Sequence, residues 1–183
     1  MTVRLRPVQQ QDSELLRAWR NQPEVSKYMY SDHYISKQEH DAWFQRAISD
    51  PSRRMWIILF SEVPVGLASM YGISEAHRHA EWAFYLADPG VRGKGVGGFV
   101  EYYILKHAFE ELNLHKLSCE VLSTNQPVIN MHIKYGFKIE GVFREHIRKG
   151  DNYIDVVRLA ILEQEWREIE REIQEKLRKR GML

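Results

Sequence analysis

Five glycines fall within residues 88–98, between a predicted strand and an amphipathic helix. Glycine permits unusual backbone dihedrals and a close approach of the chain, so several N–H groups of such a loop can converge on one anion. The helix dipole adds a favourable potential at the same point. The loop therefore predicts a binding site for a pyrophosphate. It is neither a Walker sequence, because no Gly-Lys-Ser/Thr closes it, nor the dinucleotide fingerprint, because the glycine spacing differs.

A sheet has to position this loop, and the rest of the chain predicts one. β-rich runs predict strands at residues 54–60, 65–73, 80–87 and 116–122, and apolar residues at helical spacing predict a helix over 96–108. Residues 137–148 and 153–162 predict a hairpin around a glycine-containing turn. The expected architecture is α+β, with a mixed, mostly antiparallel sheet of about seven strands and about five helices. One strand–helix–strand crossover is expected at its centre.

Helices are expected at both ends of the chain. Asp12 is the predicted cap of a first helix that Pro23 ends, and Ser36 begins a second helix with the capping-box spacing to Glu39. Residues 163–180 predict a charged helix with one apolar stripe, formed by Trp166, Ile169, Ile173 and Leu177. This stripe is expected to dock on the sheet of the same domain, with a second subunit as the alternative. Residues 1–183 are expected to form one domain.

The composition excludes several classes of function. Twenty-six basic and twenty-five acidic residues leave a net charge of +1, which offers no field for a non-specific nucleic-acid binder or a polybasic membrane protein. The single cysteine, Cys119, cannot form an internal disulfide, and residues 1–7 show no apolar segment typical of a secretory signal. We therefore expect a cytoplasmic protein that binds a small, specific ligand, with no nucleic-acid or membrane partner.

Two motifs resemble the GNAT acetyltransferase superfamily. Arg92-Gly93-Lys94-Gly95-Val96-Gly97 matches its Arg/Gln-x-x-Gly-x-Gly/Ala signature, and it lies after a predicted strand and before a helix, as the family requires. A later segment resembles the family's next strand-to-helix connection; it contains Asn125, Val128, Met131, His132, Lys134, Gly136 and Phe137. The resemblance spans residues 4–166 and implies an N-acetyltransferase that uses acetyl-CoA.

The resemblance implies acetyl-CoA as co-substrate and no metal. In the family the co-substrate lies in a V-shaped cleft where two parallel strands splay apart, here residues 80–87 and 116–123, and it supplies the missing hydrogen-bond partners. The residues implied are Tyr85, Leu86 and Ala87 for the pantetheine arm through their backbone, Asn125 for an amide of the arm, and Arg92, Gly93, Lys94, Gly95, Val96, Gly97 and Gly98 for the pyrophosphate. His77 and His79 form a lone pair in a polar loop, without further ligands for a metal.

Acetyl transfer to an amine by direct attack in a ternary complex needs a proton acceptor at the amine and a proton donor for the thiolate. By resemblance Glu120 accepts the amine proton, with Glu81 on the neighbouring strand as the fallback; the alternative is a purely structural salt bridge or hydrogen bond at Glu120. Where the family usually has a tyrosine that protonates the thiolate, this chain has His132. A protonated His132 could donate, whereas neutral imidazole is a very poor acid. A hydrogen-bonded core histidine is the competing interpretation, because Val128, His132 and Tyr135 share one helical stripe.

The N-terminal third resembles the acceptor region of the nucleotide-sugar N-acetyltransferases of pseudaminic acid biosynthesis. These acetylate the 4-amino group of UDP-4-amino-4,6-dideoxy-N-acetyl-β-L-altrosamine. The expected substrate-binding residues are Arg20, Asn21, Met29, Tyr30 and His40, together with Glu81. An arginine can bind a diphosphate with two parallel hydrogen bonds, while methionine and tyrosine offer soft and aromatic surface to a uracil ring or a sugar methyl group. The alternative is that Met29 and Tyr30 pack the first helices onto the sheet and Arg20 pairs with a local acid.

Three other functions stay open at this point. Residues 141–146 and 153–157 also resemble relatives that acetylate ribosomal-protein N-termini. A polyamine acceptor is a weaker alternative, because the acceptor half shows no acidic run to receive a polycation. A CoA-binding interaction module without catalysis is the non-enzyme alternative, motivated by the change from tyrosine to histidine and by the C-terminal helix. A homodimer is expected as a partner only if that helix seats on a second subunit.

Overall fold

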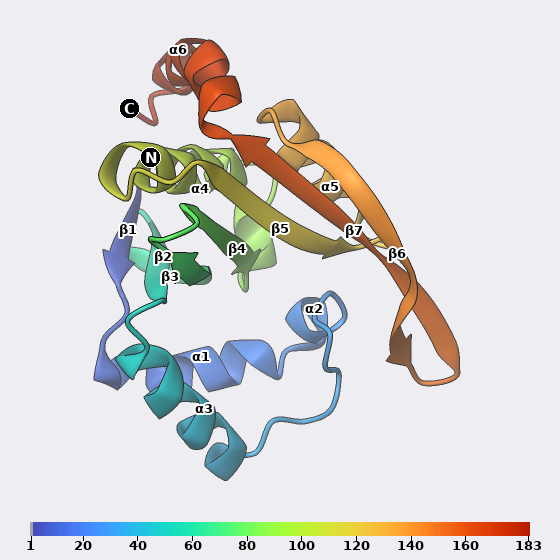
Figure 1. Cartoon of the computed structure of the whole chain (residues 1–183). Helices are drawn as coiled ribbons and strands as arrows, with labels where there is room; N and C mark the ends of the chain where they lie inside the picture. The colour runs from blue at the N-terminus through green and yellow to red at the C-terminus, as the bar shows by residue number, and fades with distance from the viewer. Residues whose placement is uncertain (1) are drawn as a thin grey trace.

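The computed structural model describes residues 2–183 and contains one seven-stranded sheet with the strand order β1-β2-β3-β4-β5-β7-β6 (Figure 1). β4 and β5 pair in parallel, and the other neighbouring pairs are antiparallel. The strands are β1 (Val3–Pro7), β2 (Arg54–Phe60), β3 (Val63–Ser74), β4 (His79–Leu86), β5 (Lys116–Leu122), β6 (Lys138–Lys149) and β7 (Asn152–Leu162). The predicted α+β fold with a mixed, mostly antiparallel sheet is confirmed.

Six α-helices cover the two faces of the sheet. On one face are α1 (Ser13–Arg20), α2 (Pro23–Ser26) and α3 (Lys37–Ser49), and on the other are α4 (Val96–Lys106), α5 (Gln126–Lys134) and α6 (Glu163–Lys179) (Figure 1). α2 is one helix more than expected. Pro23 was expected to end a helix, and it begins one instead, because the first position of a helix needs no N–H donor and suits the fixed φ of proline.

Alternating side chains of the central strands build two cores, one on each face. In β2, Trp56 and Ile58 belong to the core under α4, α5 and α6, whereas Met55, Ile57 and Leu59 belong to the core under α1, α2 and α3. This alternation follows from the period of two along a strand. The residues of one strand therefore position two separate sets of helices.

The parallel pair separates halfway along its length. β4 pairs with β5 at three positions, and the last of them joins Glu81 to Ser118. Beyond it, β4 continues to pair with β3 as far as Leu86, and β5 continues to pair with β7 as far as Leu122. The facing edges of the two strands are therefore left without each other as partners, which confirms the predicted splayed pair and opens a crevice in the middle of the sheet.

The two expected helix caps differ in outcome. Ser36 caps α3, since its hydroxyl accepts a hydrogen bond from the Glu39 N–H at 3.2 Å. Asp12 makes no side-chain cap to α1. Its carboxylate instead accepts two hydrogen bonds of 2.7 Å from Arg6 and one of 2.8 Å from the Gln9 N–H. The guanidinium beside it lowers the pKa of Asp12, so the sequence expectation was wrong because a bidentate ion pair holds this carboxylate.

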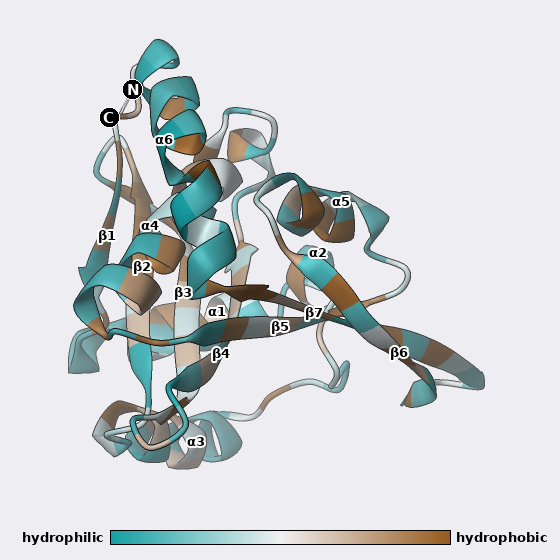
Figure 2. Cartoon of the chain, turned by 45° about the horizontal axis from the view of Figure 1, so that its top comes forward, coloured by the Kyte–Doolittle hydropathy of each residue, from teal (hydrophilic) through white to brown (hydrophobic). Residues whose placement is uncertain are grey.

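The C-terminal helix docks within the chain. Trp166, Ile173 and Leu177 are buried in the larger core, and the Trp166 ring lies 5.8 Å from the ring of Tyr102 on α4. Figure 2 shows hydrophobic residues recurring along a mostly hydrophilic α6. The stripe therefore packs on the same chain, as expected. The homodimer stays a prediction, and the α6 stripe does not support it. Among residues 2–183, no helix is long and apolar enough to cross a membrane.

Candidate active site

The glycine loop leads into the N-terminus of α4 with two residues in the left-handed region. Gly93 has φ +76° and Gly95, which caps the helix, has φ +86°. The N–H groups of residues 95–98 open the helix and have no hydrogen-bond acceptor among the described residues. Four free amides at the positive end of a helix suit a pyrophosphate, so the loop fits the diphosphate of a CoA-type ligand.

Side chains of α5 and of the residue after it pack closely on the next two glycines. A Cβ atom on Gly97 would lie 3.1 Å from the sulfur of Met131, and one on Gly98 would lie 2.1 Å from the hydroxyl of Tyr135. α5 therefore lies directly against the first turn of α4. The two expected cations lie apart: Arg92 pairs with Glu24 at 3.3 Å, and Lys94 lies over the ring of Phe60 at 5.6 Å.

Only part of the expected strand backbone faces the crevice. The N–H of Ala87 donates to Val65 on β3 at 2.8 Å, and by alternation along the strand the backbone of Tyr85 also faces β3. The backbones of Phe84 and Leu86 therefore face the open edge toward β5. Of the three expected residues, Leu86 is placed to contact a ligand through its backbone, and Phe84 was missed. Asn125 is the N-cap residue of α5, and its side chain makes no capping hydrogen bond.

Glu120 is the centre of a charged cluster on the acceptor side of the sheet. One carboxylate oxygen accepts from Arg158 at 2.7 Å, and the other accepts from the hydroxyl of Tyr30 at 2.6 Å. Arg158 also reaches Glu81 at 3.2 Å and donates to Ser118 at 2.9 Å. Hydrogen bonding to Glu120 and proximity to Glu81 raise the pKa of Arg158 despite its partial burial. Both predicted carboxylates thus share one cation that the sequence analysis missed.

His132 lies on the other side of the sheet and is buried. Its Nδ1 is 2.7 Å from a carboxylate oxygen of Glu101, a fully buried residue of α4. The ring lies edge-on to Trp82, at 5.4 Å between centroids. Burial by itself lowers the pKa of His132, but the charge of Glu101, together with the contact to Cys119, outweighs it and raises that pKa to about 10. The surroundings of His132 are those of the competing interpretation, a hydrogen-bonded core histidine. Its hydrogen-bond partner is the carboxylate of Glu101.

A cavity of about 610 Å³ lies between the N-terminal helices and the face of β2, β3 and β4. Four of the expected substrate residues line it: Arg20, Met29, Tyr30 and His40. Several buried polar atoms in its wall have no partner among the described residues: Nη1 of Arg20, Nε of Arg53, Nε2 of His40 and the hydroxyl of Tyr85. Buried polar groups are normally hydrogen-bonded, so these atoms indicate a polar ligand.

Two expected substrate residues lie outside the cavity wall. Asn21 clamps the loop before α3, since its side chain donates to the Ile35 carbonyl at 3.0 Å and accepts from the Ile35 N–H at 2.8 Å. Glu81 lies in the charged cluster with Arg158. Other wall residues were missed by the sequence analysis: Glu39, Trp43, Arg46, Arg53, Ser69 and Tyr71. For Arg158 a signal existed, because one arginine interrupts the apolar run of residues 156–161 in a predicted strand.

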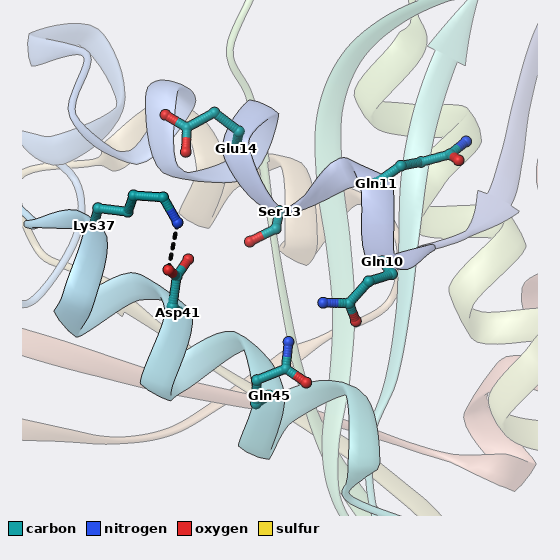
Figure 3. A pocket seen from close by; sticks show the side chains of 7 residues that line it. All are labelled: Gln10, Gln11, Ser13, Glu14, Lys37, Asp41 and Gln45. Carbon is teal, nitrogen blue, oxygen red and sulfur yellow. Dashed lines mark hydrogen bonds and ion pairs between the residues drawn. The ribbon is translucent and has the colours of Figure 1, made fainter.

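A second hollow, of about 640 Å³, lies between α1 and α3 (Figure 3). Its walls are polar side chains, and Lys37 points to Asp41 as its ion-pair partner. This hollow shares no residue with the crevice or the cavity, so we assign it no role. Among residues 2–183, no group of three or more histidine, cysteine, aspartate or glutamate side chains could hold a metal ion.

Comparison with known proteins gives a family match. The family described as "Acetyltransferase (GNAT) domain" matches residues 2–138, which is more than half of the chain. Spermidine N(1)-acetyltransferase of Escherichia coli is 26% identical over 165 residues, covering 90% of this chain and 88% of the relative. Acetyltransferase PseH of Campylobacter jejuni is 28% identical over 129 residues, covering 70% of this chain and 78% of the relative.

The fold comparison agrees with the sequence comparison. The crystal structure of spermidine N-acetyltransferase from Vibrio cholerae in complex with CoA and spermine superposes with a TM-score of 0.83 at 25% identity. The match covers 90% of this chain and 97% of that chain. The splayed strands and the glycine loop therefore occur here in a fold that holds CoA in a solved structure.

Proposed function

The chain belongs to the GNAT acetyltransferase family and is an acetyl-CoA-dependent N-acetyltransferase, and we propose that its acceptor is a UDP-linked amino-dideoxy sugar. The proposed product is the 4-acetamido sugar, formed by direct attack in a ternary complex. The acceptor expected from the sequence, UDP-4-amino-4,6-dideoxy-N-acetyl-β-L-altrosamine, belongs to this class of sugar. The single observation that carries the proposal is the unpaired, buried guanidinium of Arg20 in the cavity wall.

Arg20 is prepared to bind an anion. It makes no ion pair among residues 2–183, its Nη1 is buried without a partner, and its Nη2 donates to the hydroxyl of Ser31 at 3.1 Å. Burial lowers the pKa of Arg20, an electrostatic cost that the nearby charge of Glu39 offsets only in part. A diphosphate would remove that cost with two parallel charge-assisted hydrogen bonds. The alternative, in which Arg20 pairs with a local acid, has no support from these contacts.

The rest of the wall supports the same class of ligand. Arg46 and Arg53 add two cations against one carboxylate, that of Glu39. Trp43, Tyr71 and Met29 give aromatic and soft surface for a base or a deoxy-sugar methyl group. A volume of about 610 Å³ falls in the range of sites for small molecules, roughly 300–1,000 Å³. A cationic, partly aromatic cavity suits a uridine diphosphate.

The site residues then divide the proton transfers between the two sides of the sheet. When bound, acetyl-CoA supplies the acetyl group as an activated thioester. We propose that Glu120 accepts the proton of the amine, with Arg158 and Tyr30 fixing its orientation. His132 donates a proton to the leaving thiolate from the opposite side. Backbone groups of Phe84 and Leu86, the amides of residues 95–98 and Asn125 are proposed to hold the co-substrate.

A polyamine is the second candidate, favoured by the similarity to the two spermidine acetyltransferases. Its binding would require carboxylates that face the cavity. Glu39 lines the wall but lies 2.8 Å from His33, and Glu81 and Glu120 share Arg158. Three arginines in the same wall would repel a polycation. A ribosomal-protein N-terminus is a third acceptor, with no feature of the cavity in its favour.

The test is an acceptor competition in one tube. Acetyl-CoA is offered with equal concentrations of a UDP-4-amino sugar, spermidine and a ribosomal-protein N-terminal peptide, and acetylated products are counted by mass spectrometry. The expected result is acetylation of the nucleotide sugar with at least about tenfold preference, since one charge-assisted contact contributes about 1.5–3 kcal/mol. Preferred acetylation of spermidine or of the peptide would overturn the proposal.

Arg20→Gln sharpens this experiment. It is expected to raise KM for the nucleotide sugar about tenfold or more, because the diphosphate loses its unpaired cation. Arg17→Gln is the matched control on the same helix, since Arg17 is already engaged by Glu14 and Tyr34 outside the cavity. Equal effects of the two substitutions would contradict a diphosphate at Arg20.

A further inference from the structure

The most deeply buried charges of the molecule lie opposite each other on α4 and α5. The Glu101 side chain has no exposed surface, and that of His132 is 4% exposed. Nδ1 of His132 lies 2.7 Å from Oε1 of Glu101. Taking a carboxylate out of water is expensive unless a cation compensates it. The family resemblance explains a proton donor at residue 132 but assigns no role to Glu101.

The position of the pair relates it to the crevice. Glu81 and Ser118 are the last paired residues of β4 and β5, so Trp82 and Cys119 are the first residues beyond the parting of the strands. The imidazole of His132 contacts both: its ring is edge-on to Trp82 at 5.4 Å, and it interacts with the thiol of Cys119. His132 therefore bridges the two strands where they separate.

We propose that Glu101 is the positioning residue that holds His132 as an imidazolium, with Nδ1 fixed by the carboxylate and with the Nε2–H as the proton that is donated. In the step that uses this proton, the N–H bond at Nε2 breaks and an S–H bond forms on the departing thiolate. The electron pair of the N–H bond stays on the neutral imidazole, which regains a proton from solvent afterwards. This inference rests on the proposed role of His132 in acetyl transfer and is independent of the acceptor's identity.

Of the groups that face His132, the carboxylate of Glu101 contributes most to raising its pKa, and Cys119 also raises it. β4 contributes the rings of Trp82 and Phe84, β5 contributes the buried thiol of Cys119, and Phe137 closes the side beyond α5. Oε1 of Glu101 lies 2.7 Å from Nδ1 of His132, and Oε2 has no partner among the described residues. A carboxylate at this distance favours the charged form of the imidazole. The proton donor is then charged at neutral pH, unlike an ordinary histidine.

The experiment compares the whole protein with its Glu101→Gln variant. Histidine side-chain NMR follows the ionisation of His132, and single-turnover acetylation is measured against pH. In the wild type, His132 is expected to stay protonated through pH 8. In the variant its midpoint is expected below pH 7, and the rate at pH 8 is expected to fall at least about tenfold and to recover in part at pH 6. CoA affinity is expected to change less than about twofold, because phosphate and pantetheine contacts lie elsewhere.

Two further variants act as references. His132→Phe removes the donor and sets the lowest rate, which should no longer recover at pH 6. Glu111→Gln is the control, since Glu111 lies 2.8 Å from His107 in an exposed Glu–His pair at the far end of the same helical segment. It is expected to leave the pH profile unchanged.

Three outcomes would overturn the inference. They are a neutral His132 in the wild type at pH 7, an unchanged pH profile in Glu101→Gln, and equal effects of Glu101→Gln and Glu111→Gln. If Glu101→Gln fails to fold, the titration of the wild type decides alone. If the nucleotide sugar is not acetylated, the NMR titration still reports on Glu101, so failure of the proposed acceptor is distinguishable from failure of this pair.

Discussion

The two faces of the sheet differ in whether their buried charged side chains have partners. Under α4 and α5, Glu101 and His132 are buried and compensate each other. Under α1 and α3, Arg20 and Arg53 line a cavity with buried nitrogens that have no partner among the described residues. The first face is electrostatically complete by itself. The second is incomplete until an anion enters, and this difference indicates which face receives the variable acceptor.

The difference also separates stability from specificity. A buried pair that compensates itself contributes little net stability but becomes very costly when one partner is removed. Arg20 has no ion-pair partner among the described residues, so its burial costs stability in the free protein, and binding of an anion would return that stability. Substitutions of Glu101 or His132 should therefore change unfolding and proton transfer, whereas substitutions of the arginines in the cavity wall should change KM for the acceptor.

The largest expected effect is on the free energy of unfolding. His132→Leu leaves Glu101 buried without a counter-charge and should cost about 3–5 kcal/mol in urea unfolding. The double variant Glu101→Leu with His132→Leu should recover most of that loss, because no charge is then left unpaired. A loss below about 1 kcal/mol in the single variant would break the comparison, since the pair would then not be a buried charge pair.

The pH dependence of unfolding follows from the same pair. The folded pKa of His132, about 10, lies above its ordinary value of 6.5, so its stabilisation is complete below pH 6.5 and is lost as pH rises through about 10. Between pH 6.5 and about 8.5, below the range where a free thiol ionises, stability should fall by up to about 1.4 kcal/mol per pH unit. The double variant Glu101→Gln with His132→Gln should lack this slope in urea titrations, and an equal slope in both proteins would contradict it.

On the second face, Arg53→Gln should raise KM for the nucleotide sugar about tenfold, because the bound anion would lose a guanidinium whose Nε has no hydrogen-bond partner in the free protein. Its unfolding free energy should change by less than about 1 kcal/mol, since the nearest carboxylate, Asp50, lies 3.8 Å away at a half-exposed position. Steady-state kinetics and urea unfolding measure the two quantities. A large loss of stability with unchanged KM would reverse the division of roles.

Tyr30→Phe is expected to have a smaller effect. It removes one hydrogen bond of 2.6 Å to Glu120 and leaves the aromatic wall in place. The acetylation rate should fall about two- to fivefold, as for the loss of a hydrogen bond worth about 0.5–1 kcal/mol. Single-turnover rates test this, and a loss of more than about a hundredfold would assign Tyr30 to proton transfer itself.

The smallest effect is expected in the hollow between α1 and α3. Lys37→Gln removes an exposed ion pair with Asp41, and such pairs contribute about 0–1 kcal/mol. Neither KM for either substrate nor kcat should change more than about twofold. A larger change in steady-state assays would move part of the acceptor site into this hollow.

The sequence predicted the elements better than their connections. Period-two and helical spacing gave the strands and α4, because local patterns reflect which face is buried. The split of β4 from β5 was expected through the family resemblance, since nothing local marks where Glu81 and Ser118 stop pairing. Asp12 was misassigned as a cap, because its bidentate partner Arg6 comes from another element.

The site residues show the same limit. Arg20 and His40 were expected in the acceptor site, and both line the cavity. They could be predicted because both belong to the N-terminal segment whose helices form one side of the cavity. Glu101 was missed, since it gains its significance from a residue far along the chain, His132. Arg53 was missed because only the folded structure shows that it lines the cavity. A glutamate in an otherwise apolar helix stripe was a usable signal for Glu101.

A crystal structure of the protein with CoA and a UDP-4-amino sugar tests the central claim most directly. The account predicts the diphosphate of CoA on the amides of residues 95–98, the pantetheine arm between β4 and β5 next to His132, and the uridine diphosphate against Arg20. A structure with the nucleotide outside this cavity, or with the thiol of CoA away from His132, would contradict it.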